Sequence, residues 1–346
     1  MIDVGLVGFG LAGRAFHAPV IRATPGLRLA AIVQRSGNEA AEKYPDVRVV
    51  RSVAEFLNIP ELRLVVIATP NDTHAPIATE CLKAGRDVVV DKPFATTLEE
   101  AKGLVALAKK CGRLITVYQN RRYDGDFQAI RQIVSEGRLG RIVRFETSYD
   151  RYRPELKTGA WRERNAPGGG ILFDLAPHLI DHALVLFGLP EAVTADVRLE
   201  RVAAVVDDAF DVMLHYPGVL RAVLRATMLA ITQRPRFVLQ GTRGALFKQT
   251  FDPQEANLRR GHLSENAAWG AEPKEDWAVL TTVENDTLVR RSIASAACDY
   301  RDYYANVRDA ILGRAELAIS PQHALDVMRV LEMARESSEQ WRTIRW

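Results

Sequence analysis

The chain has 346 residues, of which 47% are hydrophobic and 26% are charged, and its formal net charge is +3. This is the composition of a folded protein that is longer than one hydrophobic core usually serves, so we expect two domains. The small net charge gives no electrostatic reason to expect a nucleic-acid or membrane partner.

The first third of the chain alternates short apolar runs with helical patterns. The runs that we predict as strands are 2–7, 27–33, 47–50, 64–68, 87–90 and 114–118. Ser52 with Glu55, and Thr97 with Glu100, have the spacing of capping boxes that begin two of the helices between them. Nearly continuous apolar strands separated by helices predict a parallel sheet covered on both faces.

The first predicted strand ends in a glycine-rich turn, GFGLAG at residues 8–13. Gly8, Gly10 and Gly13 match the G-x-G-x-x-G pattern, in which the first glycine permits a tight turn, the second lets a pyrophosphate approach, and the third lets helix and strand pack closely. The following helix N-terminus supplies unpaired N–H groups for phosphates. We therefore predict that residues 1–121 form a Rossmann domain. Its dinucleotide site would be made by Gly8, Phe9, Gly10, Leu11, Ala12 and Gly13.

The end of the second predicted strand indicates which dinucleotide binds. NAD sites usually place an acid there for the ribose 2′-hydroxyl, but this segment reads IVQRSGN and has no acid at its tip. Arg35 and Ser36, with Gln34 before them, suit a 2′-phosphate better, because a guanidinium makes charge-assisted bonds with phosphate and stacks on adenine. We predict NADP as cofactor, with NAD also possible.

A lysine and a proline stand where the fifth predicted strand ends, in the stretch DKPF at 91–94. In open α/β sheets, ligands bind beyond the carboxyl ends of the strands. Pro93 restricts the residue before it to extended backbone. Lys92 could hold a substrate hydroxyl there and stabilise alkoxide charge, or it could be an ordinary surface residue.

After residue 121 the pattern changes to longer alternating segments with few helices. A helix at 125–136 is followed by segments at 141–152, 193–202, 210–216 and 220–229, and by a hairpin at 236–249. Ser320 and Pro321 begin a C-terminal helix as N-cap and first residue. We predict that residues 122–346 form a second α/β domain with a large open, mostly antiparallel sheet; the family resemblance given below implies that this domain binds substrate and mediates oligomerisation.

The apolar helix within 171–188 carries the sequence HLIDH at 178–182, whose histidine spacing resembles that of some zinc sites. Pro177 belongs in a first helical turn, so we expect the regular helix to begin near Phe173 or Asp174. Three interpretations compete: zinc held by His178 and His182, a structural helix with satisfied histidines, or proton transfer by Asp174 and His178. We favour no metal, because no third ligand has a partnering motif.

Five motifs in order along the chain resemble those of the Gfo/Idh/MocA oxidoreductases. They are GFGLAG, TPNDTH at 69–74, DKPF, the pair Trp161 and Arg162, and GGGILFDLAPHLIDH at 168–182. The resemblance covers essentially the whole chain and is closest to the subgroup that includes NADP-dependent scyllo-inositol dehydrogenases. Asp91 stands where the family usually has glutamate.

The resemblance implies a reaction and a set of residues. It implies hydride transfer between a nicotinamide and a ring hydroxyl or ketone of an inositol, sugar or related polyol, with Lys92, Asp174 and His178 as catalytic residues. Histidine titrates near neutral pH and can take and return the proton. Further cofactor contacts are expected from Thr69, Pro70, Asn71, His74, Lys92, Pro93, Asn120, Trp161 and Arg162. Substrate contacts are expected from Lys92, Arg121, Tyr152, Asp174 and His178.

The partners and the location of the protein are also expectations. The resemblance implies a homodimer or homotetramer formed through the C-terminal sheet. Cys81, Cys111 and Cys298 permit no disulfide framework, the N-terminus lacks the basic region of a signal peptide, and no apolar run approaches a membrane span of roughly 20 residues. We therefore expect a cytoplasmic protein. The alternatives are a non-catalytic NAD(P)-binding sensor of the same fold, or a reductase of a different carbonyl substrate.

Overall fold

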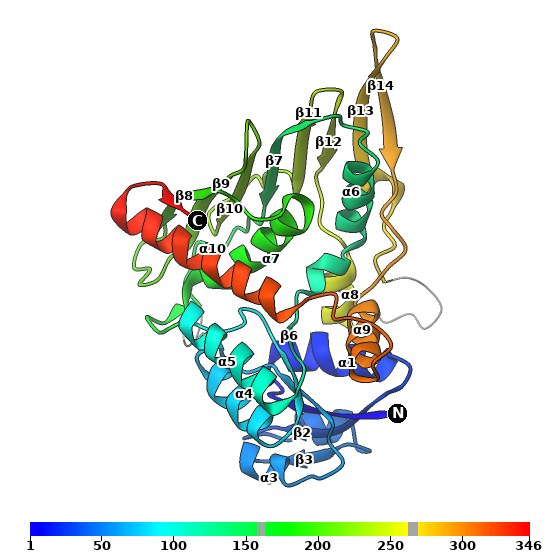
Figure 1. Cartoon of the computed structure of the whole chain (residues 1–346), viewed down its shortest axis with the longest axis vertical. Helices are drawn as coiled ribbons and strands as arrows, with labels where there is room; N and C mark the ends of the chain where they lie inside the picture. Colours follow the sequence, from blue (N-terminus) through cyan, green and yellow to red (C-terminus); the bar gives the residue numbers. More distant parts are fainter. Residues whose placement is uncertain (158, 160–162, 262–268) are drawn as a thin grey trace. The chain divides into compact units, whose positions relative to one another are not determined.

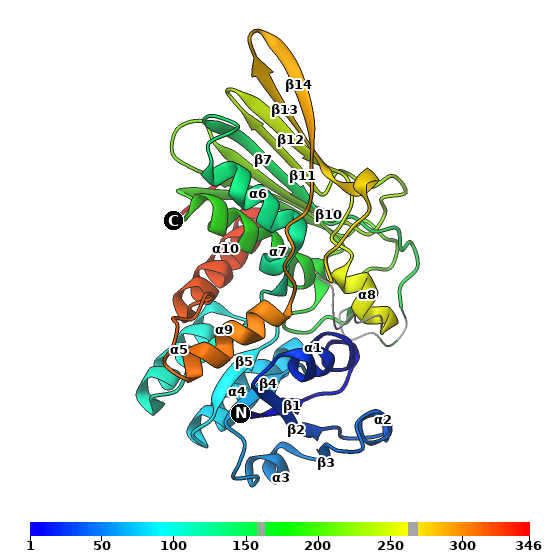
Figure 2. The ribbon, with the colours of Figure 1, turned by 90° about the vertical axis from the view of Figure 1, so that its right-hand side faces the viewer.

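The computed structural model describes residues 1–157, 159, 163–261 and 269–346, and the chain forms two compact units (Figures 1 and 2). The first unit comprises Met1–Asn120, Gln254–Trp269 and Asp299–Met328. The second comprises Arg121–Pro253, Gly270–Cys298 and Arg329–Trp346. The first crossover between the units therefore falls beside residue 121, where the sequence predicts a domain boundary.

The first unit is built on a six-stranded sheet in the order β3-β2-β1-β4-β5-β6, and all of its strand pairs are parallel. This strand order is that of the Rossmann fold. The six predicted strands are confirmed: β1 (Ile2–Val7), β2 (Leu27–Val33), β3 (Arg48–Val50), β4 (Leu64–Ile67), β5 (Asp87–Val90) and β6 (Ile115–Val117).

Short helices connect these strands. They are η1 (Gly13–His17), α1 (Ala18–Ala23), α2 (Glu39–Lys43), α3 (Val53–Leu57), η2 (Asn71–Thr73), α4 (His74–Lys83) and α5 (Leu98–Cys111). Thr97 and Glu100 make the predicted capping box at the start of α5. At α3, the Ser52 side chain accepts the N–H of Glu55, so the predicted cap is formed there too.

Later parts of the chain return to the first unit, whereas the sequence assigned everything after residue 121 to the second domain. These parts contain α8 (Gln254–Arg260), α9 (Arg301–Ile311) and the start of α10 (Pro321–Gln340). Tyr303 Oη donates to the carbonyl of Val117 at 3.1 Å, and Thr116 Oγ1 donates to the carbonyl of Ile319 at 2.7 Å. Buried contacts of this kind at the edge strand β6 attach a C-terminal segment to the Rossmann sheet.

The second unit contains a nine-stranded sheet in the order β14-β13-β12-β11-β7-β10-β9-β8-β15. Its strands are β7 (Ile142–Ser148), β8 (Ala192–Arg198), β9 (Ala209–His215), β10 (Arg221–Thr227), β11 (Phe237–Gly241), β12 (Gly244–Lys248), β13 (Ala278–Glu284), β14 (Thr287–Ile293) and β15 (Ile344–Arg345). Among the described strands of this nine-stranded sheet, only β7 and β10 pair in parallel. The predicted open, mostly antiparallel sheet is thus confirmed.

Helices α6 (Gly125–Ser135) and α7 (Gly170–Phe187) lie on one side of this sheet (Figure 2). Helix α7 packs on β7, β9 and β10. Alternate strand residues, such as Phe145, Val212 and Leu224, are fully buried. The alternation of buried and polar positions is the pattern of an antiparallel sheet with one covered face.

Helix α7 departs from the sequence prediction in its start and in its length. It begins at Gly170, so Pro177 lies inside the helix and not in its first turn. The reason is tertiary: Asp207 accepts the N–H of Ile171 through its carbonyl and the N–H of Leu172 through its carboxylate. The resulting helix has the length and composition of a membrane span, contrary to our expectation, but 78% of it is buried inside the protein, as in a core helix.

Candidate active site

The glycine-rich turn has the geometry that its three glycines predict. Gly8 has a φ of +101°, and a Cβ there would lie 2.7 Å from the carbonyl oxygen of Ala68. A Cβ at Gly13 would collide with the carbonyl of Gly8, whereas a Cβ at Gly10 would meet nothing within 4 Å. Space is therefore open at the second glycine, where a pyrophosphate would approach the backbone. The exposed Leu11 begins the helical segment that follows.

The loop after β2 presents two of the three residues predicted to recognise the 2′-phosphate. Arg35 and Ser36 are exposed. Gln34 is instead buried: its Oε1 accepts the N–H of Ala40 at 2.9 Å, and its Nε2 donates to Glu39. Gln34 therefore fixes the start of α2 and leaves the exposed positions of the loop to Arg35 and Ser36.

Arg51 holds the same loop and was not predicted. Its Nη1 donates to the carbonyls of Gln34 at 3.0 Å and Gly37 at 2.6 Å, and its Nη2 donates to Asn38 Oδ1 at 2.9 Å. Arg51 directly follows β3, the strand next to β2. Because neighbouring parallel strands end at the same edge of the sheet, this position in the sequence could have indicated that Arg51 lies beside the loop after β2.

The segment after β4 contains Thr69, Pro70, Asn71 and His74. Asn71 is 5% exposed, and Thr73 Oγ1 donates to Thr69 Oγ1 at 2.6 Å. The His74 ring is buried, with Nδ1 2.9 Å from the carbonyl oxygen of Pro93 and Nε2 3.0 Å from that of Thr69. His74 thus links the ends of β4 and β5.

The residue Lys92 follows β5 directly and is partly exposed. Its backbone N–H donates to Asp91 Oδ1 at 2.8 Å, and its peptide bond to Pro93 is cis. Within the first unit, the glycine loop, the β4 loop and Lys92 all follow the carboxyl ends of strands β1, β4 and β5. This is the edge at which open α/β sheets bind ligands.

In the second unit, α7 carries Asp174 and His178 one helical turn apart, as predicted. Asp174 is partly exposed, and its Oδ2 lies 3.6 Å from Nη1 of Arg151. His178 is 6% exposed. The helix therefore places a carboxylate and an imidazole on one face.

The other half of the HLIDH segment is structural. Asp181 accepts two hydrogen bonds from Arg122, at 3.1 and 2.5 Å. His182 Nε2 donates to the carbonyl of Arg121 at 3.1 Å, and its ring stacks on Phe127. Burial lowers the pKa of His182 to about 3, so the ring is neutral. Both residues hold the start of the second unit against α7, and no group of three metal-ligating residues forms within the described chain.

The predicted substrate contacts Arg121 and Tyr152 differ in exposure. Arg121 is 4% exposed, and it donates to Asp124 Oδ2 at 3.2 Å and to Tyr149 Oη at 2.7 Å. Tyr152 is 53% exposed. Arg121 therefore contributes to a buried polar cluster, while Tyr152 offers a free surface.

Tyr149 is a residue that the sequence did not single out. The guanidinium groups of Arg121 and Arg151 lie 4.9 and 4.8 Å from the centre of its ring. Burial acts to raise the pKa of Tyr149, but the charges and hydrogen bonds of Arg121 and Arg151 outweigh it and lower this pKa to about 7. Arg151 also faces Asp174, so Tyr149 belongs to the same electrostatic environment.

The remaining predicted site residues are Asn120, Trp161 and Arg162. Asn120 begins a short 3-10 helix, η3 (Asn120–Tyr123), and is partly exposed. Trp161 and Arg162 lie outside the described residues.

A parallel sheet of Rossmann order, a glycine loop open at its second glycine and a lysine at the end of β5 define the class of protein: a dinucleotide-binding oxidoreductase. Comparison with protein-family models supports this class. Residues 2–119 match the oxidoreductase family with an NAD-binding Rossmann fold, and residues 127–247 match the GFO/IDH/MocA C-terminal domain. The chain belongs to the Gfo/Idh/MocA family and is an NAD(P)-dependent dehydrogenase or oxidoreductase.

Relatives align over almost the whole chain. The uncharacterized oxidoreductase YdgJ of Escherichia coli is 41% identical over 99% of this chain and 98% of its own length. The scyllo-inositol 2-dehydrogenase (NADP(+)) IolW of Bacillus subtilis is 36% identical over 99% of this chain and 95% of its own length. The solved structure of yvaA from Bacillus subtilis superposes with a TM-score of 0.95 at 36% identity, over 100% of this chain and 98% of that one.

Proposed function

We propose that the protein is an NADP(H)-dependent oxidoreductase that interconverts a ring hydroxyl and a ketone of an inositol, a sugar or a related polyol. The pairing of Asp174 and His178 on one face of α7 carries this proposal, because a proton-accepting imidazole beside an orienting carboxylate is what alcohol oxidation requires. The similarity to IolW, whose name gives scyllo-inositol and NADP(+), supports the substrate class and the cofactor.

Each residue would have a distinct part in the reaction. The nicotinamide supplies the hydride acceptor when the substrate is oxidised. His178 takes the hydroxyl proton, Asp174 orients the imidazole or binds a neighbouring hydroxyl, and Lys92 stabilises the developing alkoxide. In the reducing direction, protonated His178 returns the proton to the carbonyl oxygen.

A screen of inositols, aldoses and uronates with NADP and NAD in parallel tests the substrate class by the absorbance of the reduced nicotinamide. Lys92→Ala and His178→Ala should each lower kcat by at least about a hundredfold, as expected for groups that stabilise charge or move a proton. Turnover unchanged in both variants would refute the catalytic assignment. Dinucleotide binding without turnover of any substrate would favour the sensor, and turnover of other carbonyl compounds alone would favour a different reductase.

The exposed pair Arg35 and Ser36 supports the preference for NADP, because charged and hydroxyl donors suit a 2′-phosphate. Arg35→Ala should weaken NADPH binding by about tenfold, equivalent to about 1.4 kcal/mol, and should leave NADH binding nearly unchanged. Tighter binding of NADH than of NADPH by the unaltered protein would overturn the preference.

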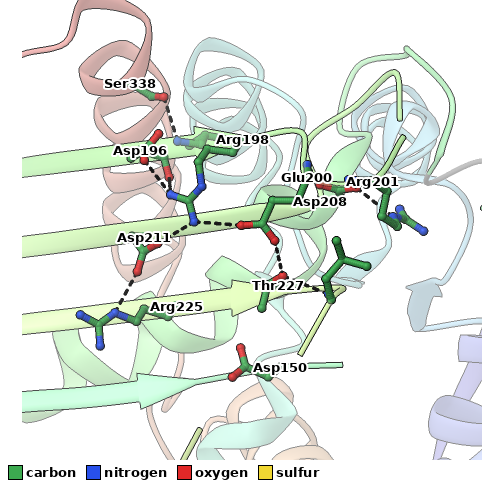
Figure 3. Close-up of polar contacts among 12 residues, drawn as sticks. Asp150, Asp196, Arg198, Glu200, Arg201, Asp208, Asp211, Arg225, Thr227 and Ser338 are labelled. Atoms are coloured by element: carbon green, nitrogen blue, oxygen red, sulfur yellow. Dashed lines mark hydrogen bonds and ion pairs between the residues drawn. The ribbon is translucent and has the colours of Figure 1, made fainter. Parts of the chain in front are cut away.

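We also propose a homodimer or homotetramer formed through the face of the nine-stranded sheet that lies away from α7. This face carries a ladder of ion pairs across β7, β10, β9 and β8, part of which Figure 3 shows. Arg225 bonds to Glu146 and Asp211 at 3.0 and 2.8 Å, and Arg198 bonds to Asp211 at 2.8 Å. On β12, two strands from β7, Phe247 is 43% exposed. Charges of both signs and an exposed aromatic side chain on one face suit a self-complementary interface.

Sedimentation velocity tests the oligomer. Phe247→Glu should convert the oligomer to a monomer, whereas Leu312→Glu, at an equally exposed apolar position after α9, should not. A monomeric unaltered protein at micromolar concentration would refute the proposal.

We propose a cytoplasmic location on the chemistry of the cysteines, because no disulfide joins any of them in the described chain. Fractionation of cells that express the protein tests this, and recovery outside the cytoplasm would contradict it.

A further inference from the structure

Asp91, the residue before Lys92, ends a chain of buried polar side chains in the first unit. Its Oδ1 accepts the backbone N–H of Lys92 at 2.8 Å. Its Oδ2 lies 3.5 Å from Nε2 of His17, which is fully buried in η1. The other ring nitrogen of His17, Nδ1, is 2.6 Å from Oη of Tyr304 on α9. The chain therefore runs from α9 through the helix after the glycine loop to the end of β5.

The protonation of this chain follows from its surroundings. Burial raises the pKa of Tyr304 well above its ordinary value, so the phenol keeps its proton and donates it to His17 Nδ1. The tautomer of His17 that accepts this bond carries its proton on Nε2, facing Asp91. This tautomer directs a ring N–H toward Asp91 across the 3.5 Å between Nε2 and Oδ2.

The Asp91 carboxyl is held in its charged form. Burial acts to raise its pKa, but the contact with His17 and the proximity of Lys92 and His74 outweigh burial and place the pKa below its ordinary value. A negative charge is thus fixed one residue from the lysine.

Packing restricts the His17 ring. Its centre lies 4.3 Å from that of the Tyr118 ring, and Tyr118 Oη donates to the carbonyl of Phe16 at 3.1 Å. Tyr303 packs against the other side of this aromatic group, with its ring centre 4.8 Å from that of Tyr118. A ring confined in this way keeps its nitrogen directed toward Asp91.

A second buried histidine holds the other side of Lys92. His74 Nδ1 lies 2.9 Å from the carbonyl oxygen of Pro93, and Nε2 lies 3.0 Å from that of Thr69. Burial lowers the pKa of His74, so the neutral ring donates to one of these carbonyls at a time. The residues on both sides of Lys92 are therefore in contact with buried histidines.

We propose that Asp91 and His17 are positioning residues for Lys92, and that the Tyr304–His17–Asp91 chain fixes the carboxylate that holds the backbone N–H of Lys92 and so orients the lysine side chain. This inference rests on the proposed function, in which Lys92 stabilises alkoxide charge on the substrate. A preorganised charge of this kind needs support from neighbouring groups with locked rotamers.

The NMR signal of Lys92 is the direct test, because its chemical shift reports the surroundings of the side-chain nitrogen. We would dimethylate the lysines of the whole protein with ¹³C-formaldehyde, record their NMR signals, and assign Lys92 by the signal missing in Lys92→Arg. Asp91→Asn should move the Lys92 signal. Tyr304→Phe should move it by a smaller amount. Tyr303→Phe is the matched control, since its hydroxyl bonds to Val117 and not to His17, and it should change nothing.

Kinetics give a second readout. Asp91→Asn should lower kcat by about ten- to a hundredfold while the Kd for NADPH changes by less than about threefold, because misplacement of a catalytic group slows the reaction without removing cofactor contacts. Asp91→Glu, which restores the charge, should recover part of kcat. His17→Leu should lower kcat as Asp91→Asn does. If His17→Leu does not fold, the result for Asp91→Asn, whose side chain has nearly the same shape as the original, decides the test.

An unmoved Lys92 signal in Asp91→Asn, or equal effects of Tyr304→Phe and Tyr303→Phe, would overturn the inference. The spectra require no turnover. If no substrate were turned over but the Lys92 signal still moved, the proposed function would fail and the positioning chain would stand.

Discussion

Asp207 holds the first turn of the helix that carries Asp174 and His178: its Oδ2 accepts the N–H of Leu172 at 2.6 Å. The same carboxylate occupies the space that a side chain at Gly170 would need, and Gly170 has a φ of +83°. Asp207, which lies outside the helix, thus caps its N-terminus, and this permits α7 to begin at Gly170.

The contribution of Asp207 to the free energy of unfolding depends on pH. Burial raises the pKa of Asp207 to about 6, even though the bond from Leu172 acts to lower it. Because the folded pKa lies above the unfolded value, the contribution of Asp207 to stability is present at low pH and is lost as the pH rises to about 6 and beyond. Asp207→Asn keeps an acceptor without the charge, and it should raise the free energy of unfolding at pH 8 by up to about 3 kcal/mol.

Urea unfolding at pH 8 and at pH 4 measures this difference. The control Asp207→Ala loses the acceptor and should be destabilised by about 1–2 kcal/mol at pH 4; at pH 8 it should gain less stability than Asp207→Asn, because it loses the acceptor together with the cost of the buried charge. An asparagine variant less stable than the unaltered protein at pH 8 would contradict the prediction.

His182 should produce the opposite trend in acid. Its pKa of about 3 in the folded protein, lowered first by burial, lies below the unfolded value. The unfolded chain therefore binds the extra proton, and stability that is complete above about pH 6.5 falls by about 1.4 kcal/mol per pH unit as the pH drops toward 3.

His182→Gln should remove this slope, because the amide can still donate to the carbonyl of Arg121 but does not titrate. Unfolding curves at several pH values between about 4 and 7 give the slope for each variant. His323→Gln, at a partly exposed position on α10, is the control and should keep the slope of the unaltered protein. Equal slopes for His182→Gln and the unaltered protein would rule out a buried neutral His182.

Tyr149 should ionise near neutral pH. Arg121, Arg151 and Arg236 face its ring, and its pKa of about 7 results because Arg121 and Arg151 outweigh the effect of burial. The folded pKa lies below the unfolded value of about 10, so this group adds stability at high pH that is lost as the pH falls through about 7.

Ultraviolet difference spectra report the tyrosinate directly. One tyrosine should titrate near pH 7 in the unaltered protein and not in Tyr149→Phe, and Arg151→Gln should shift the transition upward by removing one charge. Tyr216→Phe should leave the transition in place, because burial raises the pKa of Tyr216 well above this range. A spectrum of Tyr149→Phe identical to that of the unaltered protein would disprove the assignment.

The sequence predicted the Rossmann sheet well because its strands are buried on both faces. Such strands are nearly continuous apolar runs, so β1, β2 and β5 have the predicted bounds. The glycine loop was equally clear, since sterics require glycine at Gly8 and Gly13. These signals are local and need no knowledge of distant residues.

The contacts that the sequence did not reveal are long-range. Asp181 meets Arg122 and His182 meets Arg121 across about sixty residues, so only the fold could separate these structural residues from a metal pair. Asp207 likewise moved the start of α7. The hairpin of β13 and β14 is a different case: Asn285 and Asp286 turn with positive φ, as in a type I′ turn, and this signal was present in the sequence.

The last prediction concerns the loop that selects the cofactor. Arg51 donates three hydrogen bonds to residues 34–38 and so fixes the backbone from which Arg35 and Ser36 project. Arg51→Ala should weaken NADPH binding by about tenfold, because the loop would have to become ordered on binding, and it should change NADH binding less. Fluorescence titration gives both dissociation constants. Arg48→Ala, at an exposed arginine on the neighbouring β3, is the matched control and should change neither value. Equal losses for both cofactors in Arg51→Ala would show that the loop supports the whole site and does not select the 2′-phosphate.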